Sequence, residues 1–292
     1  MSDFLELSFA LGGLDPEAAE AACFEAGASA VTFADAADDP VLEPAPGEVR
    51  LWRNTILTGL FAPPADTLGL VRTLGHALNI PPERIATRHL EDRAWEREWL
   101  RDFHAMRFGE RLWVCPHHER VADPRAVVVR LDPGLAFGTG THASTALCLA
   151  WLDAQLLPGS RVIDFGCGSG VLAVAAALLG AAEVHAFDID PQALIATAEN
   201  AAANGVTSRV HVHALAGTLP ATSDVVLANI LAATLCTLAP QFARAVSTGG
   251  ALVLAGLLEH EVPDVTAAYS PWFDVSRFGA RDGWAALSGR RR

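Results

Sequence analysis

The chain has 292 residues, of which 51% are hydrophobic, enough to bury the cores of two domains. Its formal net charge is −13, and all 21 basic residues are arginines. Residues 1–93 hold 15 acidic and 6 basic side chains, a net charge of −9. An acidic front end disfavours direct binding to nucleic-acid phosphates and is compatible with a basic protein partner.

Two further classes are disfavoured by the same composition. The N-terminus has acids and no basic leader, unlike a signal peptide, and no apolar run approaches the roughly 20 residues of a membrane span. The five cysteines are scattered and include no C-x-x-C pair, as in reduced cytosolic proteins. We therefore expect a cytoplasmic protein without membrane contact.

The first 93 residues predict a small α+β domain. Strand-like segments alternate with helical ones in the order β-α-β-β-α-β, which is that of a ferredoxin-like unit. The strands are expected at 4–12, 30–33, 55–61 and 85–90, and the helices at 15–28 and 66–79. This part has no nucleophile–base pair and no metal-ligand spacing, so it is either a structural module or a domain that recognises something large.

Residues 94–110 predict an amphipathic linker helix. Trp95, Trp99 and Phe103 follow one another at intervals of four, while charged residues occupy the other faces. An aromatic stripe at this spacing is more often packing than a binding surface.

From residue 111 onward the pattern predicts an α/β domain. A first strand pair is expected at 111–115 and 126–131, and the alternation that follows favours a doubly wound, Rossmann-like sheet with an antiparallel finish. The further strands are expected at 162–165, 184–188, 210–214, 224–228, 251–255, 273–277 and 284–288, and the helices at 143–155, 172–179, 191–203, 231–246 and 260–268.

A glycine-rich turn is the most informative feature of this domain. A predicted buried strand leads into Gly166, Gly168 and Gly170, where the backbone can turn tightly and approach a ligand at a helix N-terminus. A dinucleotide fingerprint would need its third glycine at position 171, which is Val. Asp164 would repel a pyrophosphate and suits an ammonium group. Both features favour S-adenosylmethionine (SAM), which carries an amino-acid end and no phosphate.

Two acids follow the next predicted strand. Asp188 lies near the position, roughly 20 residues past the first glycine, from which a carboxylate binds ribose hydroxyls. Asp190 precedes Pro191, a pairing typical of a helix N-cap. We assign Asp188 to the ribose and Asp190 to capping.

Asn229 ends the predicted strand 224–228, at the edge of the sheet where ligands of such folds bind. Asn is also a favoured N-cap, and a helix follows. Both roles are compatible, and Asn229 is the catalytic candidate.

Residues 132–142 are rich in glycine and hydroxyl side chains and precede a predicted helix. Such a loop can close over a ligand and present N–H and O–H donors to it. Its candidate cofactor contacts are Phe137, Thr139 and Gly140. The histidines at 104, 117, 118 and 142 have no metal-site spacing, so no metal is expected.

Four motifs together resemble the methyltransferases of ribosomal protein L-eleven (L11), the PrmA family. They are LDPGLAFGTGTH at 131–142, VIDFGCGSG at 162–170, DIDPQA at 188–193 and ANIL at 228–231. The glycine motif belongs to any class I methyltransferase, whereas the FGTGTH loop paired with NIL is far more specific. The resemblance covers nearly the whole chain.

The resemblance implies three parts: a substrate-recognition domain at 1–93, the linker helix at 94–110 and a SAM-dependent methyltransferase domain at 111–292. It implies methyl transfer from SAM to lysine ε-amines and the N-terminal α-amine of L11, with S-adenosylhomocysteine as product.

The family's SAM contacts carry over to Thr145, Gly166, Asp188 and Asn229. The glycine spacing and the acid in front of it add Asp164 and Gly168 as candidate SAM contacts. Two departures are visible: Ala143-Ser144 stands where the family often has Pro-Thr, and His117-His118 where it often has Ser-Trp.

The reaction needs a neutral amine, whereas a free lysine has a pKa near ~10.4. A desolvated pocket beside a cationic sulfonium favours the neutral form. Asn229 and nearby carbonyls would accept the remaining N–H groups, and no general base is expected. The alternatives are a methyltransferase acting on RNA, DNA or another protein, an NAD-linked oxidoreductase, and a SAM-binding protein without catalysis.

Overall fold

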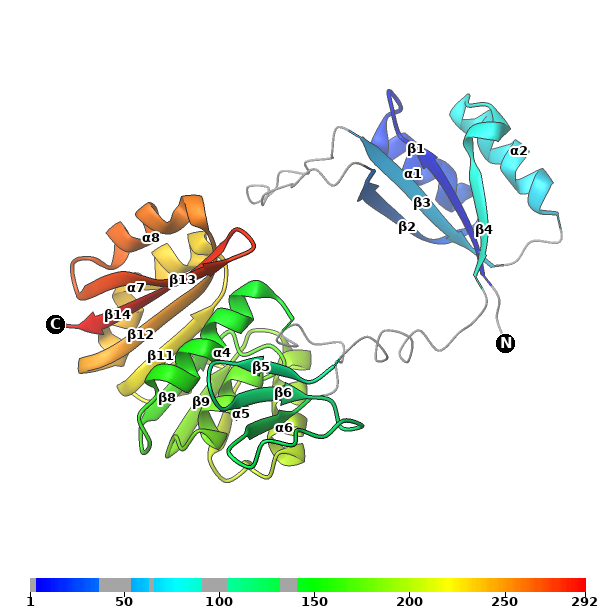
Figure 1. The fold of residues 1–292 in the computed structure, drawn as a ribbon. Helices are drawn as coiled ribbons and strands as arrows, with labels where there is room; N and C mark the ends of the chain where they lie inside the picture. Colours follow the sequence, from blue (N-terminus) through cyan, green and yellow to red (C-terminus); the bar gives the residue numbers. More distant parts are fainter. Residues whose placement is uncertain (1–3, 37–53, 63–65, 91–103, 132–140) are drawn as a thin grey trace. The chain divides into compact units, whose positions relative to one another are not determined.

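The computed structural model describes residues 4–36, 54–62, 66–90, 104–131 and 141–292. The chain divides into two compact units, Met1–Glu98 and Trp99–Arg292. Figure 1 colours the first unit blue to cyan and the second green to red.

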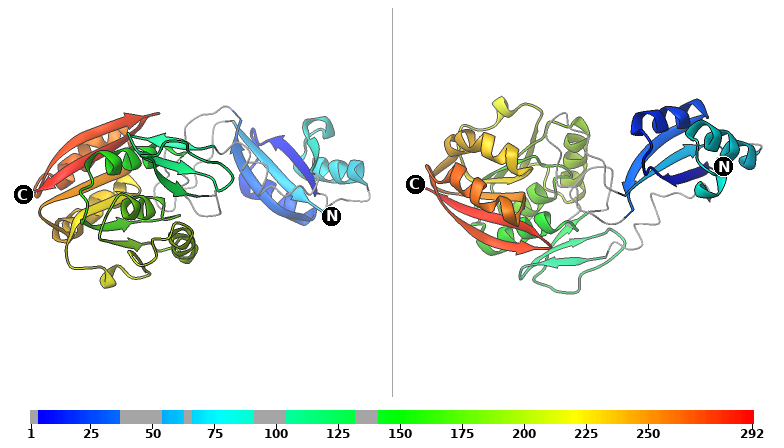
Figure 2. Two further views of the ribbon diagram at one scale, coloured as in Figure 1. Left: turned by 60° about the horizontal axis from the view of Figure 1, so that its bottom comes forward. Right: turned by 90° about the horizontal axis from the view of Figure 1, so that it is seen from above.

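The first unit is a four-stranded antiparallel sheet with two helices (Figure 2). Its strand order is β2 (Ala28–Asp35), β3 (Thr55–Phe61), β1 (Phe4–Ala10) and β4 (Ala86–Leu90). Its two helices are α1 (Pro16–Glu25) and α2 (Thr67–Leu78), and a 3-10 turn follows at Pro82–Arg84. Leu5, Leu7 and Phe9 alternate with more exposed residues along β1, so one face of the sheet carries the core. The predicted ferredoxin-like unit is confirmed.

Capping residues set where both helices of this unit begin. The Asp15 side chain accepts a hydrogen bond from the Ala18 amide at 2.8 Å, and Asp66 accepts one from the Gly69 amide at 2.9 Å. These bonds satisfy amides that a helix start leaves without partners.

The second unit is built on a seven-stranded sheet. Its strand order is β10 (Val210–His213), β9 (Glu183–Phe187), β8 (Arg161–Phe165), β11 (Ser223–Asn229), β12 (Val246–Leu258), β14 (Trp284–Arg291) and β13 (Phe273–Arg281). The first five are parallel, and β14 runs antiparallel to both of its neighbours. The predicted doubly wound sheet with an antiparallel finish is confirmed.

Helices cover both faces of this sheet, as the alternation of its buried residues requires. Val162 and Leu227 pack with α4 (Ala143–Gln155), α5 (Val171–Leu178) and α6 (Pro191–Ala203), whereas Ile163 and Val226 pack with α7 (Ala232–Ala245) and α8 (Val262–Tyr269). Two 3-10 turns lie at Ala216–Thr218 and Glu259–Glu261. Neighbouring residues of one strand thus belong to different cores.

A separate three-stranded sheet precedes α4. It consists of β5 (Met106–Phe108), β6 (Leu112–Cys115) and β7 (Val127–Arg130), with β5 antiparallel and β7 parallel to β6. Both predicted strands at 111–115 and 126–131 are therefore confirmed.

The linker helix expected at 94–110 is wrong at its C-terminal end, because Met106–Phe108 form β5. Gly109 turns the chain at φ 74°, and Met106 then pairs with Val114. A strand of three residues is too short to show a period of two. The aromatic stripe at 95, 99 and 103 lies outside the described residues.

Two further expectations concern the whole chain. In the part that the structure describes, no helix is long and apolar enough to cross a membrane. All five cysteines are free thiols.

Candidate active site

The carboxyl ends of β8, β9 and β11 converge with the first turn of α4. The Gly168 amide donates a hydrogen bond to Asp188 Oδ2 at 2.9 Å, and Asn229 Nδ2 donates one to Thr145 Oγ1 at 3.1 Å. Two pairs of predicted site residues are thus in direct contact. The other candidates of the 132–142 loop, Phe137, Thr139 and Gly140, lie outside the described residues.

The three glycines of the turn all adopt left-handed backbone conformations. Their φ angles are 81° at Gly166, 54° at Gly168 and 77° at Gly170, a region that L side chains rarely enter. A Cβ on Gly170 would also lie 2.7 Å from Thr197 Oγ1 on α6. Residue 170 must therefore lack a side chain, because Thr197 of α6 packs closely against the start of α5.

Ile230, the residue after Asn229, is held between two glycines. A Cβ on Gly166 would collide with its Cγ2, and a Cβ on Gly256 would lie 2.6 Å from its carbonyl oxygen. The Ile230 amide donates to the Ala255 carbonyl at 3.1 Å. Because Gly166 and Gly256 have no side chains, the chain can turn at Ile230 directly after β11. This turn fixes the position of the Asn229 backbone.

Asn229 is the last residue of β11 and is partly buried, while Thr145 is fully buried. The N-cap of α7 is Leu231, so the alternative role of Asn229 as a helix cap is wrong. Ile230 and Leu231 lie between Asn229 and the first residue of α7, Ala232, so Asn229 is too far from the helix to cap it. Because the amide group of Asn229 donates to Thr145, its Oδ1 is directed to the other side as an acceptor.

Asp188 has a structural role that the sequence did not reveal. Its Oδ2 accepts from the Gly168 amide, and its Oδ1 accepts from the Asp190 amide at 3.0 Å. Each oxygen keeps a further lone pair. Asp190 caps α6, accepting from the Gln192 amide at 2.9 Å, as predicted.

Asp164 is a fully buried carboxyl group beneath this turn. Neither oxygen has a hydrogen-bond partner among the described residues. Burial raises the pKa of Asp164 to about 7; the Ala173 amide, which lies outside hydrogen-bonding geometry, opposes this rise and the charge of Asp188 adds to it. A cationic group placed beside Asp164 would stabilise its ionised form.

Helix α6 contributes residues to the turn that sequence reasoning missed. Thr197 Oγ1 donates to the Gly168 carbonyl at 3.1 Å, and Asn200 Nδ2 donates to the Ser169 carbonyl at 2.8 Å. The available signal was polar residues at i, i+3 and i+7: Thr197 and Asn200 in an Ala-rich helix, and Asn204 at its C-cap.

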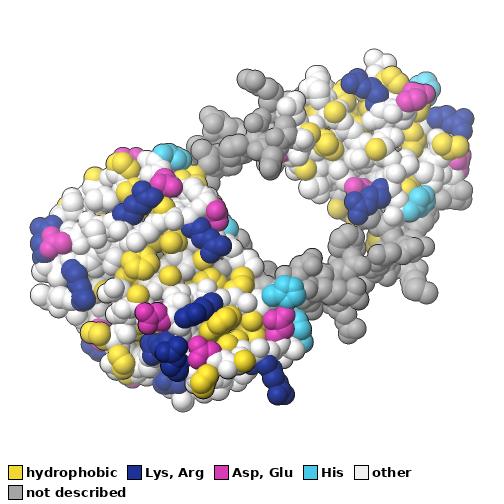
Figure 3. Space-filling model, in the orientation of Figure 1, with side chains coloured by type: hydrophobic (Ala, Val, Ile, Leu, Met, Phe, Trp, Pro, Cys, Tyr) yellow, Lys and Arg dark blue, Asp and Glu magenta, His cyan; other side chains and the backbone are white. Residues whose placement is uncertain are grey.

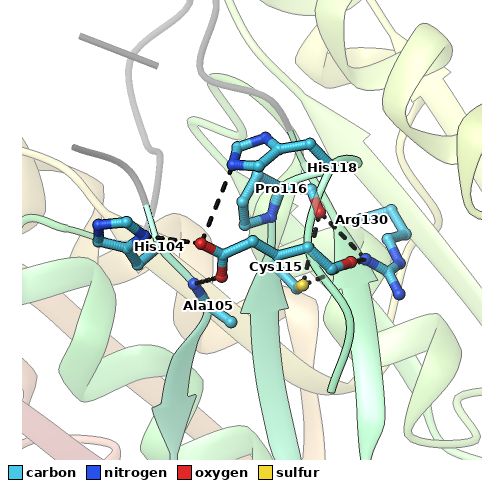
Figure 4. A network of polar contacts seen from close by, with 7 residues as sticks. His104, Ala105, Cys115, Pro116, His118 and Arg130 are labelled. Atoms are coloured by element: carbon cyan, nitrogen blue, oxygen red, sulfur yellow. Dashed lines mark hydrogen bonds and ion pairs between the residues drawn. The ribbon is translucent and has the colours of Figure 1, made fainter. Parts of the chain in front are cut away.

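The histidines are engaged in local structure. His104 Nδ1 lies 2.6 Å from Glu119 Oε1, and His118 Nε2 lies 3.9 Å from the same oxygen (Figure 4). His142 caps α4 and contacts the Ser144 hydroxyl at 2.7 Å, so the helix begins at Ala143 despite the departure at 143–144. Over the described ranges, no cluster of three or more His, Cys, Asp or Glu side chains could hold a metal ion.

Comparison with known proteins agrees with this geometry. The family model for ribosomal protein L11 methyltransferase (PrmA) matches residues 3–292. The chain belongs to the PrmA family.

Named relatives and a solved structure support the same assignment. The ribosomal protein L11 methyltransferase of Alkalilimnicola ehrlichii is 49% identical over 269 residues, 91% of each chain. That of Klebsiella pneumoniae (strain 342) is 46% identical over 290 residues, 99% of each chain. The crystal structure of a ribosomal protein L11 methylase from Lactobacillus delbrueckii subsp. bulgaricus has a TM-score of 0.60 and 29% identity, covering 65% of this chain and 100% of that one. Membership of this family shows that the chain is a class I, SAM-dependent methyltransferase.

Proposed function

We propose that this chain transfers methyl groups from SAM to lysine ε-amines and the N-terminal α-amine of ribosomal protein L11. The observation that carries the transfer chemistry is the Asn229 carboxamide, held by Thr145 beside the glycine turn, and the choice of L11 rests on the family match over residues 3–292. The carboxamide is an oriented acceptor at the edge of the sheet where ligands of such folds bind.

The described residues fit SAM. Asp164, buried and without a hydrogen-bond partner in the described part of the chain, would hold the ammonium group. The backbone of the glycine turn, above all at Gly166 and Gly168, would lie against the ligand. Asp188 would bind the ribose hydroxyls with its remaining lone pairs.

Thr145 would act through Asn229, whose carboxamide it holds from the first turn of α4. We keep Phe137, Thr139 and Gly140 as further proposed contacts, on the resemblance of their motif to the family. Bound SAM supplies an electrophilic methyl group on a sulfonium.

The protein's part in catalysis is to place and desolvate the amine. Asn229 Oδ1 would accept an N–H of the neutral amine and aim its lone pair toward the donor. A desolvated site beside a positive charge lowers the amine pKa and so favours the neutral form. We propose no general base.

The protein substrate follows from the relatives and from the division of the chain. The relatives' names specify ribosomal protein L11, and the candidate site residues all belong to the second unit, which leaves the first unit for recognition of the protein. We place the reaction in the cytoplasm, where ribosomal proteins reside.

Direct nucleic-acid binding is not part of this proposal. The net charge is −13, and on the face shown in Figure 3 the arginines of the second unit are scattered among acidic and apolar side chains. Action on RNA would be expected to use a basic, aromatic-rich face.

The testing experiment is incubation of the protein with purified L11 and methyl-labelled SAM, followed by mass spectrometry of L11 peptides. We expect label on amines of L11. Label on added RNA with none on L11 would replace the proposed substrate.

A further inference from the structure

Asparagines on one face of α6 and at its C-cap connect the glycine turn to the end of β7. Asn200 Nδ2 donates to the Ser169 carbonyl at 2.8 Å. One helical turn later, Asn204 Nδ2 donates to the Asn200 carbonyl at 2.8 Å. Both side chains are only partly exposed, so these bonds are partly shielded from water.

Asn204 also binds both backbone polar groups of Arg130, the last residue of β7. Its Oδ1 accepts from the Arg130 amide at 2.7 Å, and its Nδ2 donates to the Arg130 carbonyl at 2.8 Å. The carboxamide thus pairs with Arg130 as a neighbouring strand residue would. Because both backbone polar groups of Arg130 are bound, its position at the end of β7 is fixed relative to α6.

The Arg130 side chain continues the network away from α6. Its guanidinium donates to the carbonyls of Pro116 and Glu119 at 3.0 and 2.6 Å and to Cys115 Sγ at 3.1 Å (Figure 4). The Glu119 carboxylate in turn accepts from the Ala105 amide at 2.8 Å. Arg130 therefore joins the segment after β6 to β7 through its side chain, while Asn204 holds its backbone.

We propose that Asn200 and Asn204 are positioning residues for the methyl donor, acting through the glycine turn and β7. Asn200 holds the Ser169 carbonyl, and the peptide units on both sides of Ser169 belong to the turn that would contact SAM. Asn204 holds α6 against β7, so the Asn200 side chain keeps its place. This inference rests on the proposed function, because SAM is the ligand that the turn serves.

The test is calorimetric titration of SAM into the full-length protein and its variants, with kinetics on L11. Asn200→Ala removes one hydrogen bond to the turn, so we expect the SAM Kd to rise about fivefold. Asn204→Ala is expected to raise it by about threefold. The kcat at saturating SAM and the KM for L11 are expected to stay within about twofold of the parent, since neither residue touches the proposed substrate amine.

Glu199→Gln is the matched control, because Glu199 is an exposed residue of the same helix. The titration stoichiometry reports the folded fraction and the Kd reports the site, so partial unfolding does not imitate the expected result. Asn200→Asp, which keeps the shape and loses the donor, is expected to weaken SAM binding at least as much as Asn200→Ala. Unchanged SAM affinity in all three Asn variants would overturn this inference alone, whereas a parent protein that binds no SAM would overturn the proposed function.

Discussion

Asn229 at the end of β11 donates its side-chain amide to the buried Thr145 hydroxyl in the first turn of α4. The bond joins two segments that are far apart in the chain and fixes which end of the carboxamide is left to accept. It gives Asn229 a fixed orientation before any substrate binds, which is what preorganised catalysis requires.

The first prediction concerns this pair. Asn229→Ala removes the acceptor, and we expect kcat to fall by about 10²-fold. Thr145→Val keeps the shape but releases the carboxamide, so a loss of about tenfold in kcat is expected. Steady-state kinetics with L11 measures both. Near-normal turnover of Asn229→Ala would remove the residue from the mechanism.

The second prediction concerns the ribose assignment. Asp188→Asn keeps an oxygen acceptor for the Gly168 amide but loses charge and one acceptor, so SAM affinity should fall by about tenfold or more. Asp190→Asn is the control, because Asn caps a helix as well as Asp does. Calorimetry that finds equal SAM affinity in the parent and in Asp188→Asn would refute the assignment.

The third prediction is a pH dependence of SAM binding through Asp164. Burial raises the pKa of this carboxyl to about 7 in the ligand-free protein, and a bound ammonium group favours its ionised form. SAM affinity should therefore be full above pH ~7 and fall as the pH drops below it. In Asp164→Asn, affinity should be weak and flat across this window, whereas Glu199→Gln should behave as the parent.

The same group predicts the pH dependence of stability, with a definite sign. The pKa of Asp164 is raised above its unfolded value of ~3.9, so its ionised form destabilises the ligand-free fold. Its contribution to the free energy of unfolding should be lost as the pH rises from ~4 to ~7. Denaturant titrations should show this fall in the parent and a smaller one in Asp164→Asn. Equal slopes in the two proteins would contradict it.

The fifth prediction separates backbone strain from contact at the glycine turn. Gly166 and Gly159 have similar φ angles of 81° and 84°, but a Cβ would meet Ile230 at Gly166 and nothing within 4 Å at Gly159. Gly159→Ala should cost about 1–2 kcal/mol of stability, while Gly166→Ala should cost more and weaken SAM binding. Thermal unfolding and SAM titration of both variants measure this. Equal effects of the two changes would show that Ile230 does not constrain the turn.

Much of this fold could be predicted because local signals and tertiary structure agree. The helices at 143–155 and 191–203 lie where expected, since His142 and Asp190 cap them and the segments after them are long and Ala-rich. Strand β12 was expected at 251–255 and runs from Val246 to Leu258, because its pairing with β11 and β14 extends a segment whose glycines conceal it.

The parts of the site that could not be predicted depend on distant contacts. Nothing in the sequence near Gly256 indicates that it must be small to admit the Ile230 backbone. The bond from the Gly168 amide to Asp188 and the pairing of Asn204 with Arg130 likewise join segments that only the folded sheet brings together. Spacing indicated which residues bear the chemistry, and tertiary contacts determine how each is held.

The most direct test of the central claim is a methyl-transfer assay on purified L11 with parent and Asn229→Ala proteins at saturating SAM. We expect mass additions of whole methyl groups on L11 amines with the parent and far slower addition with the variant. SAM binding by the parent without any transfer to L11 would contradict it.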